Sequence, residues 1–99
     1  MLHIVNKSPA QTSSLASCLR LAQDGHTLLL IEDGVYAATA GLAAASGLAA
    51  AVERLQVVAL LPDLEARGVA ARLIDGVSTV DYTGFVDLIA EHSTNQSWL

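Results

Sequence analysis

Two continuous apolar runs, at residues 27–32 and 55–61, constrain the fold of this chain more than any other feature of its sequence. The first is TLLLIE and the second is LQVVALL, and neither alternates between apolar and polar residues. Strands of this kind are buried on both faces, which is typical of a parallel sheet with helices on both sides. Residues that stop strands follow each run, Glu32-Asp33-Gly34 after the first and Pro62-Asp63 after the second. We therefore expect two buried, neighbouring parallel strands.

The rest of the chain alternates between strand-like and helix-like segments. In chain order, we predict a strand at 2–6, a helix over 14–22 capped by hydroxyls of residues 12–14, an alanine-rich helix over 35–54 broken near Gly41 or Gly47, a short helical turn at 64–68, a strand at 77–82, a helix at 82–92 and a polar tail at 93–99. Strands that alternate with helices predict an α/β fold: one domain over residues 1–99, with a mostly parallel sheet of about four strands and helices on both faces.

The apolar content of the chain is high for its length. Hydrophobic residues make up 53% of the 99 residues, charged residues only 15%, and the mean hydropathy is +0.47. A small domain has a large surface relative to its volume, and here few charges are available to cover that surface. Although alanine accounts for much of the excess, we expect part of the apolar surface to be buried against other subunits.

The charge pattern and the hydropathy pattern argue against several classes of partner. The net charge is −5, and the five Lys and Arg residues are spread singly at positions 7, 20, 54, 67 and 72, so we expect no direct binding of nucleic acid. No strongly apolar run reaches the roughly 18 to 20 residues of a membrane span, since the nearest candidate, residues 35–52, is mostly alanine with two internal glycines. The first residues, MLHIVNK, do not resemble a signal peptide. We therefore expect no contact with a membrane and a cytoplasmic location.

Acidic residues follow several of the predicted strands. Glu32, Asp33, Asp63 and Asp81 would meet at the carboxyl edge of a parallel sheet, where α/β proteins bind ligands. They could bind a hard metal ion, or they could cap helices and remain solvated, and the second interpretation is favoured. The chain contains neither GxGxxG nor GxxxxGK[ST], and the spacing of its three histidines and one cysteine is not that of a zinc site. We expect no metal and no cofactor.

Cys18, the only cysteine, is the one serious candidate for a catalytic nucleophile. It shares an apolar helix face with Leu15, Leu19 and Ala22, and it lies too far into the helix to gain much from the helix dipole. Burial among apolar side chains raises the pKa of a thiol and lowers its reactivity. The spacing therefore favours an inert thiol over a reactive one. The only tryptophan, Trp98, should anchor the polar tail either to its own domain or to a partner.

Five segments in this order and spacing, together with Trp98 near the end of the chain, resemble the DsrH/TusB family of sulfur-relay proteins. They are LHIVNKSP at 2–9, SLASCLRLA at 14–22, EDGVYAA at 32–38, PDLEARG at 62–68 and DYTGFVDL at 81–88. The resemblance covers nearly the whole chain, and the third and fifth segments are its most specific parts. It implies a small α/β fold of the DsrE type.

The resemblance also implies a function and an assembly. Members of the family are subunits of a heterohexamer with DsrE/TusD-like and DsrF/TusC-like subunits. That complex passes persulfide sulfur from a cysteine of the DsrE/TusD subunit to a DsrC/TusE-like carrier protein. The TusB branch serves 2-thiolation of the wobble uridine of tRNA, and the DsrH branch serves sulfur oxidation. A cysteine in the first helix is more typical of the DsrH branch.

On this interpretation the chain is a non-catalytic or accessory subunit, and Cys18 is a secondary thiol. Two alternatives remain at this point. The chain could itself transfer sulfur through Cys18, or it could be a stand-alone acidic binding module with a metal ion at the strand ends.

Overall fold

Five parallel strands form one sheet in the computed structural model, which describes residues 1–98. In chain order the strands are β1 (Leu2–Val5), β2 (Thr27–Leu30), β3 (Gln56–Leu60), β4 (Val77–Val80) and β5 (Asn95–Trp98). Their order across the sheet is β4-β3-β2-β1-β5, and every neighbouring pair is parallel. The predicted fold class is confirmed, and the sheet has one strand more than the four expected.

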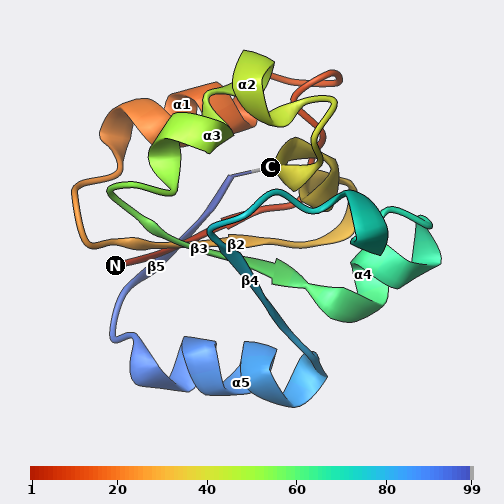
Figure 1. Cartoon of the computed structure of the whole chain (residues 1–99). Helices are drawn as coiled ribbons and strands as arrows, with labels where there is room; N and C mark the ends of the chain where they lie inside the picture. The colour runs from red at the N-terminus through yellow and green to blue at the C-terminus, as the bar shows by residue number, and fades with distance from the viewer. Residues whose placement is uncertain (99) are drawn as a thin grey trace.

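Helices cover both faces of the sheet, but unequally (Figure 1). The helical elements are α1 (Ser14–Leu21), the 3-10 helix η1 (Glu32–Ala38), α2 (Ala43–Ser46), α3 (Leu48–Ala51), α4 (Leu61–Ala66), the 3-10 helix η2 (Ala70–Arg72) and α5 (Tyr82–Glu91). Helices α1, α2 and α3 lie on one side of the sheet and α5 lies on the other. The strand order explains this. The right-handed crossovers that lead from β1 through β2 and β3 to β4 all advance toward one edge of the sheet, whereas the crossover from β4 to β5 returns to the other edge. Crossovers of one hand that run in opposite directions lie on opposite faces of a sheet.

The two faces bury apolar clusters of different size. All four residues of β2 and the last four of β3 are buried, as expected for central strands. The larger cluster lies against α1, η1 and α3 and includes Leu28, Leu30, Val35 and Leu48. On the α5 side, the fully buried residues of the smaller cluster are Leu2, Leu29 and Val58, against which Phe85 and Leu88 of α5 pack.

The alanine-rich segment at 35–54, predicted as a helix broken near Gly41 or Gly47, is divided further than expected. A 3-10 helix begins earlier, at Glu32, and the next regular helix begins only at Ala43. Gly47 adopts a left-handed conformation with φ of 84°, which separates α2 from α3 at one of the two predicted breaks. A Cβ atom on Gly34 would clash with the carbonyl oxygen of Val5, so this glycine lets η1 approach β1 closely.

The polar tail forms strand β5, which was not expected. Asn95 to Trp98 pair with Leu2 to Val5 in parallel register at the edge of the sheet. The first three residues of β5 are exposed, so their side chains carry no apolar signal that would identify a strand. Trp98 is half-buried and packs against the larger cluster of its own domain. Of the two anchoring sites considered for Trp98, the structure therefore supports its own domain.

Candidate functional site

Cys18 lies in the middle of α1 and is completely buried against the sheet. Burial raises the pKa of this thiol to about 11, and the positive charge of Arg54 offsets only part of the effect. The burial expected from the spacing is confirmed. A thiol with this pKa is almost entirely protonated near neutral pH, so Cys18 has neither the thiolate nor the access to solvent that sulfur chemistry requires.

The side chain of Arg54 caps the C-terminal end of helix α1. Its guanidinium donates one hydrogen bond to the carbonyl of Leu19 (2.6 Å) and another to the carbonyl of Ala22 (2.8 Å). It also lies 3.5 Å from the carboxylate of Asp24. These carbonyls have no partner within the helix, so Arg54 closes the C-terminus of α1 from the loop before β3. The guanidinium whose charge acts on Cys18 is therefore held in place by contacts with Leu19, Ala22 and Asp24.

The carboxylates at the strand ends hold loops together. Oδ2 of Asp63 accepts a hydrogen bond from the backbone N–H of Glu32 at 2.6 Å, and Glu32 has a positive φ of 50°. Nε of Arg67 donates to Oδ1 of Asp33 at 2.9 Å. Asp81 caps α5 by accepting from the N–H of Gly84 at 2.8 Å. These contacts fit the interpretation that the carboxylates have structural roles.

The alternative of a metal site receives no support from the arrangement of donors. Among residues 1–98, no group of three or more His, Cys, Asp and Glu side chains is placed to hold a metal ion. Asp33 and Asp63 share the cation Arg67, which lies 4.0 Å from the carboxylate of Asp63.

Two histidines that lie far apart in the sequence meet in the structure. Nε2 of His3 lies 3.0 Å from Nδ1 of His26, and Nδ1 of His3 lies 3.2 Å from Nε1 of Trp98. Burial and the charge of His26 lower the pKa of His3. The sequence did not predict this cluster, because its three members come together only through the pairing of β1 with β2 and β5. Both ring nitrogens of His3 therefore have a hydrogen-bond partner within this cluster.

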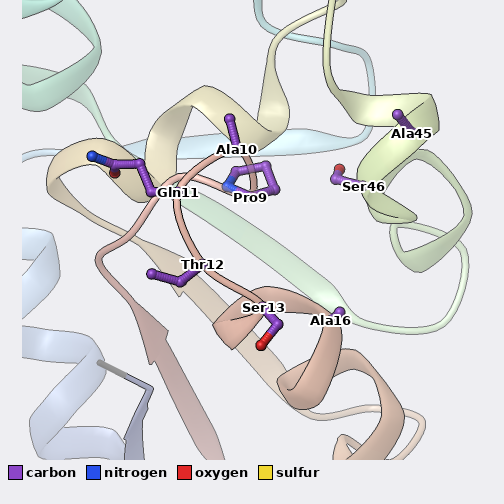
Figure 2. A pocket seen from close by; sticks show the side chains of 8 residues that line it. All are labelled: Pro9, Ala10, Gln11, Thr12, Ser13, Ala16, Ala45 and Ser46. Carbon is purple, nitrogen blue, oxygen red and sulfur yellow. The ribbon is translucent and has the colours of Figure 1, made fainter.

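An open groove of about 460 Å³ runs between the loop after β1 and helix α2 (Figure 2). Pro9 to Ser13 and Ala16 form one wall, and Ala45 and Ser46 form the other. Its lining offers hydroxyl and amide groups but no ionisable side chain. Cys18 does not line it. The groove therefore brings neither a base nor the thiol to a bound molecule.

Helix α5 presents an apolar side to solvent as well as one to the sheet. Phe85 and Leu88 pack toward the sheet, whereas Ile89 is 38% exposed. Tyr82 and Val86 are exposed beside it. In the part of the chain that the structure describes, no helix has the length and apolar character needed to cross a bilayer.

The fold defines a class of small α/β domains built on a parallel sheet. Two solved structures share it at 17% sequence identity each. One is a protein of unknown function, MTH1491, from Methanobacterium thermoautotrophicum, with a TM-score of 0.73 over 97% of this chain and 95% of that one. The other is the ychN protein of E. coli, with a TM-score of 0.71 over 97% of both chains.

The chain belongs to the DsrH family. The sequence model of that family, described as DsrH like protein, matches residues 7–95. Protein TusB of Escherichia coli O81 is 41% identical over 99% of this chain and 100% of its own length. Protein TusB of Shigella flexneri is 40% identical over the same shares of both chains. The family identified from the sequence is confirmed.

Proposed function

We propose that this chain, as one domain over residues 1–99, is an accessory subunit of a cytoplasmic sulfur-relay complex of the DsrEFH/TusBCD type. The observation that carries the proposal is the family match, which extends over the whole fold at 40 to 41% identity to proteins named TusB. The partners are DsrE/TusD-like and DsrF/TusC-like subunits in a heterohexamer, and the sulfur acceptor is a DsrC/TusE-like carrier.

The chemistry of persulfide transfer supports a sulfur-carrying cysteine on another subunit. A thiolate attacks the outer sulfur of a persulfide, a new S–S bond forms, and the donor cysteine leaves as a thiolate. The rate depends on the thiolate fraction of the attacking group and on its access. Cys18 is completely buried and its pKa is about 11, so both quantities are small. Cys18 is then a secondary thiol, and direct sulfur transfer through it is disfavoured.

The names of the relatives favour one branch of the family. Both relatives described above are called TusB, which supports 2-thiolation of the wobble uridine of tRNA as the process served. The cysteine in α1 is the feature that favours sulfur oxidation instead. Because Cys18 is a buried part of the core, it is a weaker guide to function than similarity over the full chain. We therefore place the chain in the tRNA branch.

Co-purification tests the proposal. The chain would be co-expressed with the DsrE- and DsrF-type subunits of the same organism, with an affinity tag on this chain only. We expect both subunits to be recovered in fixed proportion, and native mass spectrometry to give the mass of a complex containing all three. Recovery of this chain alone, with both other subunits soluble in the lysate, would contradict the proposal.

A further inference from the structure

The cluster of His3, His26 and Trp98 has no position for an additional proton. At one end, Nδ1 of His3 faces the indole N–H of Trp98 at 3.2 Å. At the other end, Nδ1 of His26 faces the backbone N–H of Gln23 at 3.2 Å. Both of these partners can only donate, so each Nδ1 must accept, and the 3.0 Å contact between the rings uses the proton on Nε2 of His3. A proton added to either ring therefore sets two N–H groups against each other.

Strand β5 depends on this cluster for its attachment to the core. The strand lies at the edge of the sheet and pairs with β1 alone. Its first three side chains are exposed, and Trp98 is the only one of its four residues that packs against the core. An edge strand with so little buried surface opens at a lower free energy than the central strands. Loss of the contact between Trp98 and His3 therefore affects β5 before it affects β2 or β3.

The charges around His3 oppose its protonation. Burial, the charge of His26 and the N-terminal amine all lower the pKa of His3, and the flanking strands β2 and β5 carry no ionisable side chain. Besides His26, the ionisable groups of helix α1, the loop after it and the loop before β3 are Cys18, Arg20, Asp24, Glu53 and Arg54. Asp24 pairs with Arg54 at 3.5 Å, and within residues 1–98 no carboxylate forms an ion pair with either histidine. The described structure therefore offers a protonated ring no anionic partner.

We propose that this cluster is a proton-operated latch: a proton on His3 or His26 releases β5 from β1 while the rest of the domain stays folded. The ring that gains the proton loses its bond from Trp98 or from Gln23, and the indole leaves the core. Strand β5 remains connected to α5 through residues 92–94, and its release bares the edge of β1. Since histidine changes charge between about pH 5 and pH 8, the latch is closed near neutral pH and opens in mildly acidic solution. It is a property of this chain alone and does not rest on the proposed function.

Fluorescence of Trp98, the only tryptophan of the chain, reports release directly. The full chain is titrated from about pH 8 to about pH 5, with the emission maximum and quenching by acrylamide as readouts. A protonated imidazole can dim an indole without exposing it, so the position of the maximum, and not the intensity, reports exposure. The variant His3→Asn/His26→Asn keeps an acceptor near each Nδ1 but does not titrate. His92→Gln is the matched control, because His92 contacts the carbonyl of Leu88 and lies outside the cluster.

Amide hydrogen exchange at about pH 7.5 and about pH 5.5, corrected for the intrinsic rates, distinguishes release of β5 from unfolding of the domain. In wild type and in His92→Gln we expect a red-shifted emission and at least about tenfold lower protection of β5 at the lower pH, with β2 and β3 unchanged. The double variant should show neither change.

Three results would overturn the latch: an emission maximum that stays constant down to the lowest pH, an equal shift in the folded double variant, or a loss of protection in all strands together. If the double variant does not fold, the imidazole signals of wild-type His3 and His26, followed by NMR, take its place. Release of β5 that follows the titration of either ring then supports the latch, and release that follows neither contradicts it.

Discussion

Trp98 and His3 are joined by a hydrogen bond across 95 residues of sequence, from Nε1 of the indole to Nδ1 of the imidazole at 3.2 Å. Because an indole nitrogen only donates, Nδ1 of His3 must be the acceptor, and the proton of the neutral ring lies on Nε2. That proton points to Nδ1 of His26 at 3.0 Å, which also accepts from the backbone N–H of Gln23 at 3.2 Å. The bond thus fixes the tautomer of His3 and ties β5 to β1.

The first prediction concerns acid stability. Burial, His26 and the N-terminal amine all lower the pKa of His3 below its ordinary value of 6.5, so the unfolded chain binds this proton more readily than the folded one. The resulting stability is complete above about pH 6.5 and is lost as the pH falls toward the folded-state pKa. Protonation at Nδ1 would also place two N–H groups against each other at Trp98.

Thermal unfolding between about pH 8 and pH 5 checks this expectation. The midpoint should fall with pH in wild type and much less in His3→Asn, which keeps an acceptor but does not titrate. His92→Gln is the control, because Nδ1 of His92 bonds only within its own helix end, to the carbonyl of Leu88 at 2.7 Å. An equal slope in wild type and His3→Asn would contradict the account.

The second prediction concerns the thiol. The pKa of Cys18 rises from 9.0 to about 11 on folding, so its contribution to stability is complete below pH 9 and is lost as the pH rises through about 11. In Cys18→Ala this part of the alkaline loss should be absent. A thiol reagent should label native wild type far more slowly than the urea-unfolded chain. Labelling of the native chain at the unfolded rate would mean that Cys18 is not sealed.

The third prediction concerns the closure of α1. Replacing Arg54 by Met removes two charge-assisted hydrogen bonds to the carbonyls of Leu19 and Ala22, and we expect a loss of about 2 kcal/mol in the free energy of unfolding. Arg20 is the matched control, since it is exposed and contacts only Ser17 Oγ at 3.3 Å. Arg20→Met should change the free energy by less than about 0.5 kcal/mol in urea titrations. Equal losses in the two variants would remove the special role of Arg54.

The fourth prediction concerns the approach of η1 to β1. Gly34→Ala places a methyl group against the carbonyl oxygen of Val5, so the backbone must shift, and we expect a loss of about 3 kcal/mol or failure to fold. Gly41→Ala is the control, because nothing lies within 4 Å of the added atom. Urea unfolding of both variants measures the difference. If Gly34→Ala is as stable as Gly41→Ala, the close contact at Val5 is absent in solution.

The local sequence pattern was sufficient to predict those elements whose successive residues are nearly all buried. The runs at 27–32 and 55–61 predicted β2 and β3, and the spacing around Cys18 predicted its burial. Strand β5 was missed because an edge strand exposes polar side chains, and its pairing with β1 depends on a crossover and not on its own composition. Such long-range pairing is invisible to local periodicity.

The 3-10 helix η1 and the histidine cluster were missed for related reasons. Alanine packs equally well in several helical geometries, so Ala37 and Ala38 gave no sign of the tight 3-10 turn that carries them against the sheet. His3 and His26 are neighbours only because β1 pairs with β2. Helix α5 was predicted from the sequence, but its rotation on the sheet, which packs Phe85 and Leu88 inward and leaves Ile89 exposed, depends on the packing of the whole domain.

The central claim is that this chain serves sulfur relay to tRNA without carrying the sulfur on Cys18. The most direct measurement is the content of wobble 2-thiouridine in tRNA from a native host in which the gene has been deleted. We predict that the modified nucleoside is lost on deletion and restored equally by wild-type chain and by Cys18→Ala. Unchanged 2-thiouridine after deletion would contradict the relay role. A folded Cys18→Ala chain that fails to restore it would show that Cys18 takes part in the transfer.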